Sequence, residues 1–479
     1  MIDLAARNWQ SSAVRAASQI TSLRRSLREL PLKRAGLRLA PWSVPLALAA
    51  AFALVVSSAP GTEARGAVRR PPKLPALTAK PLKNRNVLLV LTESVRFDAV
   101  CVEHALDCKM TPFTDRAAEG RLPLLETRSS TSTTAISVSV LLTGLLPTQT
   151  TEAIRTMPTL FDYARSAGYD TAYWSSQSTM FTNSQAFLAA LPLSKRCVGA
   201  DLEPPTDDAG ADDARLTERV KRELSTLREP WFAVVQYANT HFPYRVRGDE
   251  PFQPSSRSKG AEENAQFRNH YQNSVYAQDR TVADLLSSLR ASRPGSRTIV
   301  IYTSDHGEAF REHGQLGHTT SLFEEEIHVP TWVDAPPGTL TDEERDAIGA
   351  AKRALVWHVD FAPTVLDLMG LADAPSLATF RARMVGTSFL RRERTNVVLP
   401  LTNCTDTWGC GFRNWGAIQR KLKLEAREFD EQWHCYDVAI DPNEKHDLGP
   451  DACPELRRAV LGMFGRLPRD APPMRGLVP

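Results

Sequence analysis

Short apolar runs that alternate with helical segments constrain the fold of this chain most strongly. Residues 86–92 read NVLLVLT, residues 231–237 read WFAVVQY and residues 298–303 read TIVIYT. Such a continuous apolar run is typical of a strand that is buried on both faces of a parallel sheet. Residues 159–168 and 269–292 have helical periodicity instead. The alternation predicts an α/β fold in which helices cover both faces of a mostly parallel sheet.

The N-terminal region differs from the rest of the 479-residue chain in charge and hydropathy. Residues 1–40 form a basic segment, and residues 60–85 form a Pro- and Lys/Arg-rich linker. Between them, residues 41–59 are an uncharged apolar run of the length that crosses a bilayer. This run predicts a transmembrane anchor, with a cleaved signal segment or a buried core helix as alternatives. We expect the body of the protein to lie at the cell membrane on its periplasmic or other extracytoplasmic side, or to be secreted after cleavage.

The body of the protein begins after the linker and is mildly acidic. Its 43 Lys/Arg and 52 Asp/Glu form no basic stripe, so nucleic acid is not an expected partner. Residues 86–395 hold the alternating strands and helices of a large domain. Residues 396–479 are expected to form a smaller C-terminal subdomain with a short sheet and a helix.

Seven cysteines are consistent with an exported protein. Six of them fall into three pairs of sequence neighbours, and Cys197 is left alone. Spacing does not determine connectivity, so three local disulfides remain a hypothesis. The pairs in this hypothesis are Cys101–Cys108, Cys404–Cys410 and Cys435–Cys453.

Polar residues follow each of the three apolar runs. Glu93 directly follows the first run, His241 lies shortly after the second, and Asp305 with His306 follows the third. Chemistry in parallel sheets gathers at the carboxyl ends of the strands, so we expect these side chains to meet at one edge. Acids together with imidazoles at such an edge predict a metal site.

Two further segments add candidate residues to this edge. The stretch 304–320, SDHGEAFREHGQLGHTT, also contains His313 and His318. The stretch 129–147, SSTSTTAISVSVLLTGLLP, is a run of hydroxyl residues that leads into an apolar helical segment. A hydroxyl at a helix N-terminus meets free backbone N–H groups and the positive end of the helix dipole, which suits a tetrahedral anion. An ordinary Ser/Thr N-cap is the alternative.

Six stretches, in order, resemble the sulfatase-like branch of the alkaline phosphatase superfamily. They are NVLLVLTESVRFDAV (86–100), MTPFTDRAAEGRL (110–122), LLTGLLP (141–147), SDHGE (304–308), HVDFAPTVLDLMG (358–370) and CYDVAIDPNEKHDL (435–448). The resemblance covers roughly residues 86–450. It implies an alkaline-phosphatase-like three-layer sandwich with a mostly parallel central sheet and a smaller C-terminal subdomain.

The sequence departs from true sulfatases at the position of their nucleophile. Counting back from LLTG places that nucleophile on Thr134, whereas sulfatases use a Cys or Ser that is oxidised to formylglycine. Threonine cannot form this aldehyde, and Val138 stands where the sulfatase CxPSR motif has its arginine. The chain resembles instead the threonine branch, with phosphoethanolamine transferases and lipoteichoic acid synthases. This implies a metal-dependent phosphoryl-type transferase or phosphoester hydrolase that acts through a threonine alkoxide.

The resemblance also implies a set of site residues. The implied metal ligands are Glu93, Thr134, Asp305 and His306. The implied substrate contacts are His241, His318 and Lys423, of which the two histidines are also catalytic together with Thr134. A nitrogen ligand beside two carboxylates favours zinc, with manganese possible and calcium disfavoured. No cofactor other than the metal is expected.

Several alternatives stay open from the sequence alone. His241 and His318 also fit packed core histidines, and Lys423 also fits an ordinary strand lysine. His313 is predicted to be a solvated loop residue, and His358 is predicted to support the fold. For the whole protein, a sulfuric ester hydrolase and a non-catalytic envelope binding or scaffold protein are the rival functions. The expected partner is a lipid, glycan or small molecule that carries a phosphoester or a sulfate, with membrane contact through the anchor.

Overall fold

The computed structural model describes residues 68–77, 85–178, 184–204, 210–392, 397–405, 407–408, 413–428 and 432–464. The predicted basic segment and the predicted anchor at residues 41–59 therefore lie outside the described residues. Within the described ranges, no helix is both long enough and apolar enough to cross a membrane.

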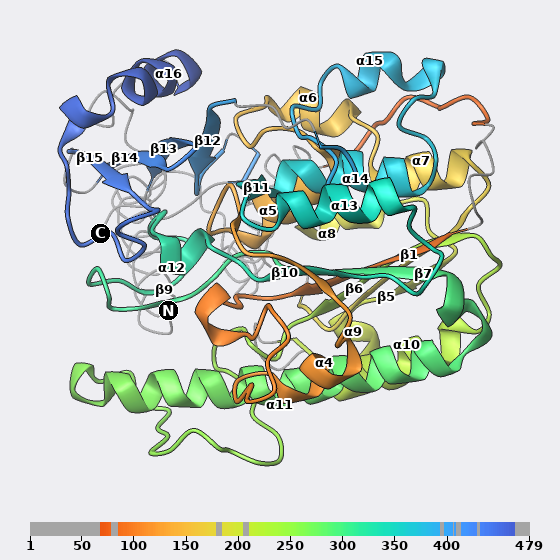
Figure 1. Cartoon of the computed structure of the whole chain (residues 1–479), viewed down its shortest axis with the longest axis horizontal. Coiled ribbons are helices and arrows are strands. Elements are labelled where there is room, and N and C mark those ends of the chain that lie inside the picture. The colour runs from red at the N-terminus through yellow and green to blue at the C-terminus, as the bar shows by residue number, and fades with distance from the viewer. Residues whose placement is uncertain are drawn as a thin grey trace, which may run out of the picture. The chain divides into compact units, whose positions relative to one another are not determined.

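A seven-stranded sheet forms the centre of the body (Figure 1). Its strands are β1 (Asn86–Thr92), β2 (Leu122–Leu124), β4 (Asp170–Ser175), β5 (Lys195–Cys197), β6 (Trp231–Tyr237), β7 (Thr298–Ser304) and β10 (Thr331–Asp334). Their order is β2-β10-β7-β1-β6-β4-β5, and β10 alone runs in the direction opposite to the other six strands. The three predicted apolar runs are thus the central strands β7, β1 and β6, which confirms the mostly parallel sheet.

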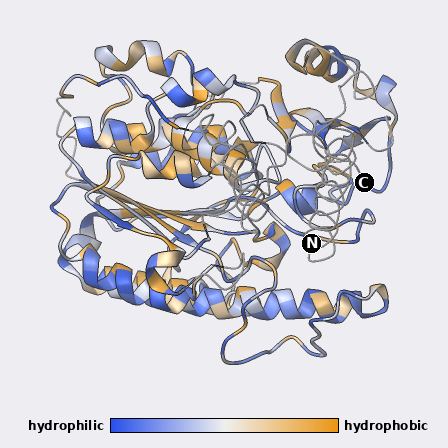
Figure 2. Ribbon diagram, turned by 180° about the vertical axis from the view of Figure 1, so that it is seen from behind, coloured by the Kyte–Doolittle hydropathy of each residue, from blue (hydrophilic) through white to orange (hydrophobic). Residues whose placement is uncertain are grey.

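Helices cover both faces of this sheet and create three layers (Figure 1). One face carries α5 (Thr134–Thr143), α7 (Leu160–Ser166), α13 (Asp342–Ala351) and α14 (Phe361–Leu368). The other face carries α4 (Pro112–Ala117), α10 (Asp213–Leu224) and α11 (Asn264–Ala291). Along β1, Val87 and Leu89 join the core on the α5 side, whereas Leu88 and Val90 join the core under α10 and α11. Figure 2 shows the resulting hydrophobic sheet between helices whose outer faces are hydrophilic.

A second, antiparallel sheet follows at the C-terminus, as predicted. It consists of β12 (Leu399–Thr402), β13 (Asn414–Gln419), β14 (Leu422–Arg427) and β15 (Trp433–Asp437) in that order. Helix α16 (Pro454–Phe464) packs on it, and Leu456 and Val460 share a core with Trp415 and Leu424.

The short elements connect and border these layers. They are β3 (Thr127–Arg128), β8 (Ala309–Phe310), β9 (Leu316–Gly317), β11 (Val356–Trp357), α6 (Thr151–Thr156), α8 (Ser184–Ala189), α9 (Gly199–Leu202), α12 (Glu324–Ile327) and α15 (Ala378–Arg381). The predicted helix 269–292 begins earlier than expected, at Asn264. Its first turns are polar, but Phe267 is buried and extends the apolar face of the helix.

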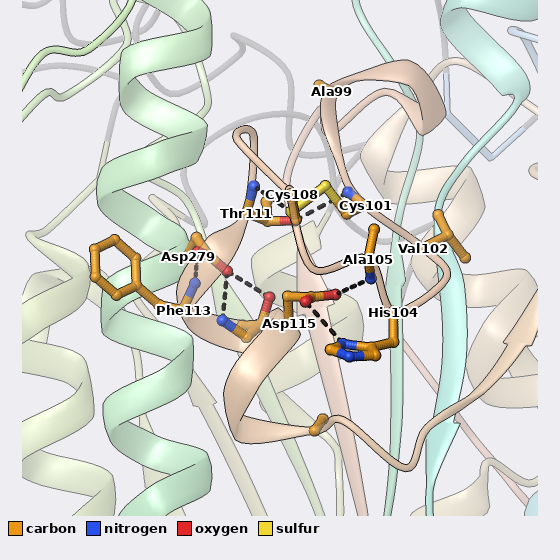
Figure 3. Close-up of a disulfide and its surroundings, with 12 residues drawn as sticks. Ala99, Cys101, Val102, His104, Ala105, Cys108, Thr111, Phe113, Asp115 and Asp279 are labelled. Atoms are coloured by element: carbon orange, nitrogen blue, oxygen red, sulfur yellow. Dashed lines mark hydrogen bonds and ion pairs between the residues drawn. A yellow bond between two sulfur atoms is a disulfide. The ribbon is translucent and has the colours of Figure 1, made fainter.

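Two of the hypothesised disulfides are confirmed. Cys101–Cys108 closes the loop between the β1 turn and α4, where the Cys101 N–H donates to Thr111 Oγ1 at 2.9 Å (Figure 3). Next to this loop, Asp279 of α11 accepts a hydrogen bond from the Phe113 N–H at 2.8 Å. The disulfide loop is therefore adjacent to the contact that joins α4 to α11.

The other cysteines agree with the hypothesis as far as the described residues reach. Cys435 pairs with Cys453 and links β15 to the turn before α16. Cys404 is disulfide-bonded, while Cys410 lies outside the described residues. Cys197 is free and buried.

Candidate functional site

The turns after β1 and β7 bring two carboxylates together. Thr92 and Ser304 are register partners at the ends of these parallel strands, so Glu93 and Asp305 leave the sheet side by side. Ser94 has a φ of 57°, a left-handed conformation that costs a non-glycine residue about 1 kcal/mol. In this conformation the Ser94 N–H donates to Asp305 Oδ1 at 3.0 Å, and the His306 N–H donates to the same oxygen at 2.8 Å. One Asp305 oxygen is thus fixed by the backbone.

Thr134 reaches these turns from the first position of α5. Its side chain is buried, and Oγ1 donates to Glu93 Oε1 at 2.9 Å while lying 3.1 Å from His306 Nε2. The N-terminal end of α5 has free backbone N–H groups and a positive dipole end, which stabilise an anion held near Oγ1. The hydroxyl run thus supplies a helix N-terminus at the carboxyl edge of the sheet, where the sequence predicted it.

The tautomer of His306 follows from its other ring nitrogen. Nδ1 lies 2.9 Å from the Gly307 carbonyl oxygen, so Nδ1 carries the proton and donates it. The lone pair of Nε2 therefore faces Thr134 Oγ1 and lies 3.5 Å from Glu93 Oε1. A hydroxyl has only one hydrogen to donate, so Thr134 cannot satisfy both Glu93 and His306.

This excess of electron-pair donors fits a divalent cation. Asp305 Oδ2 is buried, has no hydrogen-bond partner among the described residues and lies 3.5 Å from His306 Nε2. In the described part of the chain, neither Glu93 nor Asp305 pairs with a lysine or arginine. Burial and the neighbouring Asp305 raise the pKa of Glu93 well above its ordinary value. Carboxylate, imidazole and hydroxyl donors converge here, and ligand atoms of Glu93, His306 and His318 lie within 4.8 Å of one another.

Two more histidines border the same edge. His318 Nδ1 lies 3.2 Å from Glu308 Oε2, and the His318 ring centroid lies 4.5 Å from that of His306. His241 donates from Nδ1 to the Phe242 carbonyl at 2.8 Å, and its ring centroid lies 5.4 Å from that of His318. Both histidines therefore keep Nε2 available for a substrate.

The two histidines differ in protonation. Burial, together with the neighbouring His318, lowers the pKa of His241 to about 4. Burial also acts to lower the pKa of His318, but the charge of Glu308 outweighs it and the net shift is upward. A neutral imidazole and an imidazole that favours its charged form thus stand together at the site.

Backbone strain occurs beside His318 as well. Thr319 has a φ of 71°, which is unusual for a β-branched residue. Its N–H donates to the Ser132 carbonyl in the hydroxyl run at 3.1 Å, and its carbonyl accepts from Asn403 Nδ2 at 2.7 Å. These bonds hold the His318 segment against the segment that precedes α5. Strain of this kind is characteristic of functional sites.

Lys423 has a different environment from the other predicted site residues. Its fully buried ammonium group pairs with Glu444 at 2.5 Å and with Glu324 at 3.4 Å, and it donates to the Leu322 carbonyl at 2.7 Å. These contacts do not include the residues around Thr134. A substrate contact for Lys423 stays a prediction.

His313 and His358 are both part of the packing. The prediction of a solvated His313 was wrong, because Nδ1 lies 2.7 Å from Glu325 Oε1 and the ring stacks on Phe323 at 3.6 Å. His358 is buried, and its Nδ1 lies 3.0 Å from Ser137 Oγ, which donates to the Asp305 carbonyl at 2.7 Å. The ring of His358 thus helps to fix the Asp305 turn through Ser137.

The sequence reasoning missed two residues, Gln177 and Glu308. Gln177 Nε2 donates to Glu93 Oε2 at 3.2 Å, and Glu308 orients His318. Gln177 follows β4 as Glu93 follows β1, so the rule about strand ends would have found it. Glu308 ends the SDHGE motif, and the position of an acid three residues after Asp305 was the signal for it.

The sequence profile of the sulfatase family matches residues 85–371, which is more than half of the chain. The chain belongs to the sulfatase family. Among curated proteins it is similar to arylsulfatase K of Mus musculus, with 31% identity over 178 residues, 36% of this chain and 31% of that protein. The chain spans about a third or less of the length of the curated relatives that it matches first.

Solved structures show that the fold of this sulfatase-family chain is alkaline-phosphatase-like, as the resemblance implied. The soluble domain of lipooligosaccharide phosphoethanolamine transferase A from Neisseria meningitidis matches with a TM-score of 0.51 at 19% identity, covering 63% of this chain and 90% of that one. The C-terminal periplasmic domain of EptC from Escherichia coli, solved as a complex with Zn, matches with a TM-score of 0.52 at 18% identity. That match covers 63% of this chain and 87% of the EptC domain.

Proposed function

We propose that this protein is a metal-dependent phosphoryl-type transferase or phosphoester hydrolase in which Thr134 is the nucleophile. The observation that carries the proposal is the position of Thr134 Oγ1 at a helix N-terminus, 2.9 Å from Glu93 Oε1 and 3.1 Å from His306 Nε2. A hydroxyl among a carboxylate, an imidazole and a helix N-terminus has the surroundings of an activated nucleophile that attacks an anionic ester.

The reaction proceeds in two displacements at phosphorus. In the first, a bond forms between Thr134 Oγ1 and phosphorus, and the bond from phosphorus to the oxygen of the leaving alcohol breaks. The hydroxyl proton of Thr134 leaves through its hydrogen bond to Glu93, and the leaving alcohol takes a proton from His318.

In the second displacement, water or another alcohol gives its proton to His318, which the first step left neutral, and its oxygen attacks the phosphothreonine. The bond between phosphorus and Thr134 Oγ1 breaks, and Oγ1 takes back the proton from Glu93. His241 is neutral and donates from Nδ1 to Phe242, so its Nε2 lone pair accepts a hydrogen bond from the attacking water.

A divalent metal fits the donors of this site. Glu93, Thr134, Asp305 and His306 would hold it, and the unpaired Asp305 Oδ2 supports this assignment. When bound, the metal supplies positive charge that lowers the pKa of the nucleophile and stabilises the anion. We propose zinc, because the ligand set contains a nitrogen donor and because the similar EptC domain was solved with Zn. Manganese is the second candidate and calcium the least suited.

Sulfate ester hydrolysis is the second candidate function. The matching family profile and the similarity to arylsulfatase K favour it. The residue at the nucleophile position favours phosphate, because threonine cannot form the formylglycine that sulfatases use. Turnover of an aryl sulfate by this protein would need a direct attack by the threonine hydroxyl.

The proposed place of action is the extracytoplasmic side of the cell membrane. The similar EptC structure is described as a periplasmic domain, and the sequence predicts an export or anchor segment at residues 41–59. The proposed substrate is a phosphoester-bearing lipid, glycan or small molecule of the envelope. A non-catalytic binding role remains the outcome if metal-loaded protein turns over no ester.

The test compares three p-nitrophenyl esters on zinc-loaded protein: a phosphodiester, a phosphomonoester and a sulfate. We expect the phosphodiester to be hydrolysed fastest. Thr134→Ala should lower kcat by at least about 1000-fold, because the covalent route is lost. Bound zinc, measured by atomic emission, should persist because three ligands remain.

The control is Thr143→Ala, at the other end of α5. Within the described ranges, Thr143 Oγ1 bonds to the Ser139 carbonyl and the Leu145 N–H and to no site residue, so this variant should keep its activity. Full activity of Thr134→Ala, or a sulfate rate above both phosphate rates, would refute the proposed reaction.

A further inference from the structure

A small cavity lies beside Thr134, between the N-terminal half of α5 and the ends of β4 and β6. Gln177, Gln236 and Trp408 line it together with Thr134, and Phe187 and Leu188 supply an apolar wall. Its volume is about 10 Å³ for the centre of a water-sized sphere, so it accommodates a single small group. The cavity is therefore positioned to bind one small substituent of a substrate that is held at Thr134.

Three polar atoms of the cavity residues lack hydrogen-bond partners within the part of the chain that the structure describes. They are Gln177 Oε1, Gln236 Nε2 and Trp408 Nε1. Each belongs to a side chain that is no more than 2% exposed. A buried polar group without a hydrogen-bond partner is unfavourable, so three such groups on the side chains that line one cavity indicate a missing polar occupant.

The orientations of both amides follow from their other hydrogen bonds. Gln177 Nε2 donates to the Glu93 carboxylate at 3.2 Å, so the opposite atom, facing no partner, is the oxygen. Ser175 Oγ accepts from the Gln177 N–H at 3.0 Å and donates to Gln236 Oε1 at 3.3 Å, which leaves Gln236 Nε2 as the unpaired atom. Tyr173 donates to the same Gln236 oxygen at 2.5 Å.

The three cavity-lining side chains thus carry two unpaired donors and one unpaired acceptor. A hydroxyl has one hydrogen to donate and two lone pairs that accept, so it matches this set atom for atom. An ammonium group has no lone pair for the two donors, and a methyl group satisfies none of the three atoms. We propose that this cavity binds an alcohol hydroxyl of the phosphoester substrate, which makes the substrate a polyol phosphoester of the glycerol or sugar type.

The inference rests on the proposed phosphoester function and specifies its substrate class. Thr134 lines the same cavity, so the hydroxyl belongs to the group that stays on phosphorus or lies within a few bonds of it. The apolar wall of Phe187 and Leu188 excludes a second polar group. An ethanolamine phosphoester is accordingly disfavoured, because its ammonium group has no lone pair for the two donors.

The experiment uses three p-nitrophenyl phosphodiesters that share one leaving group. Their second alcohols are 1,3-propanediol, which carries a free hydroxyl, 1-propanol, which lacks it, and ethanolamine, which carries an ammonium group instead. Release of p-nitrophenol by attack of the propanediol hydroxyl on its own phosphorus is measured with Thr134→Ala and subtracted. With full-chain, zinc-loaded protein, we expect kcat/KM for the propanediol ester to exceed the other two by roughly 10- to 100-fold.

Two variants remove one donor each without removing the nucleophile. Gln236→Met and Trp408→Phe should each reduce the preference for the propanediol ester over the propanol ester by about 10-fold. The matched control is Gln272→Met on α11, whose amide bonds to the Ala99 carbonyl at 3.0 Å on the other side of the sheet. The control should keep the full preference.

The outcomes separate this inference from the proposed function. If no diester is turned over, the proposed function fails. If all three are turned over at equal rates, or if the two variants keep the preference, the cavity holds only water and the inference is overturned. A preference for the ethanolamine ester overturns it as well.

Discussion

At the scale of single residues, the site has more buried hydrogen-bond acceptors than hydrogens to donate to them. Thr134 has one hydroxyl hydrogen for Glu93 Oε1 and His306 Nε2, while Asp305 Oδ2 has no donor among the described residues. Unpaired buried acceptors are costly, so an electropositive occupant stabilises this arrangement. The set of metal-ligating atoms as a whole thus argues for the metal more strongly than any single predicted ligand.

The positions of some single residues could be predicted from the sequence, and those of others could not. Glu93, Asp305 and His306 were predictable because they directly follow buried strands, whose ends share one edge of the sheet. His313 was not, since its contacts with Glu325 and Phe323 depend on how the loop after β7 folds back on α12. No local pattern in a sequence encodes such a contact.

His313 provides a prediction about the pH dependence of stability. Burial alone would lower its pKa, but the hydrogen bond and charge of Glu325 raise it overall. The ion pair therefore contributes fully below the unfolded pKa of about 6.5 and is lost as pH rises through the higher folded pKa. We expect His313→Gln to lower the free energy of unfolding by about 1–2 kcal/mol more near pH 6 than near pH 9, as measured in urea.

The control for this prediction is His446→Gln, since the His446 side chain is 82% exposed. It should change stability by less than about 0.5 kcal/mol at either pH. A cost of His313→Gln that is equal at both pH values, or larger near pH 9, would show that the charged pair with Glu325 does not stabilise the fold.

At the scale of elements, close approach of backbones fixes the turn after β7. Gly307 has the Glu325 carbonyl oxygen 2.2 Å from the place where a Cβ would stand, so any side chain there would displace α12. The Gly307 and Glu308 N–H groups donate to the Glu326 and Glu325 carbonyls at 2.8 and 2.9 Å. The glycine in SDHGE thus allows α12 to lie against the turn that carries Asp305 and His306.

Element types were predicted better than element ends. Helix α14 starts at Phe361 after a short 3-10 turn at His358–Asp360, although the apolar pattern begins earlier. The Asp360 carboxylate accepts from the Trp357 N–H at 3.0 Å and from the Thr387 N–H at 2.7 Å, which fixes this entry. A boundary set by such distant partners cannot be derived from periodicity.

Substitution of Lys423 tests whether this residue of the C-terminal sheet stabilises the fold or binds the substrate. Its ammonium group on β14 pairs with Glu444 and with Glu324 of α12, and Glu324 also pairs with Arg128 at 2.7 Å. Lys423→Met therefore leaves the buried Glu444 carboxylate without its Lys423 partner, while Glu324 keeps Arg128. Breaking a buried ion pair in this way costs about 3–5 kcal/mol. We expect a loss of this size in urea unfolding, with an unchanged KM for the phosphodiester in the protein that remains folded.

The matched control is Lys421→Met. Lys421 pairs with Asp437 at 2.8 Å but its side chain is 59% exposed, so the stability change should stay below about 1 kcal/mol. A Lys423→Met variant with normal stability and a strongly raised KM would instead establish Lys423 as the substrate contact that the family resemblance implies.

At the scale of the whole molecule, the sheet assembles the site from distant parts of the chain. The order β7-β1-β6-β4 sets four strand ends beside one another, and they position Asp305, Glu93, His241 and Gln177. The layers were predictable because their strands are apolar on both faces. The antiparallel direction of β10 and the cavity lined by Gln177 and Gln236 were not predictable. Each depends on side chains from several elements that only the complete fold brings together.

The central claim is that Thr134 carries the phosphoryl group during turnover. The most direct test is to mix zinc-loaded protein with the propanediol p-nitrophenyl phosphodiester, quench in acid within the first turnovers, and determine the mass of the peptide that contains Thr134. The account predicts a peptide heavier by the propanediol phosphoryl group, with fragmentation that assigns it to Thr134. An unmodified Thr134 during rapid turnover, or an adduct on another residue, would contradict the account.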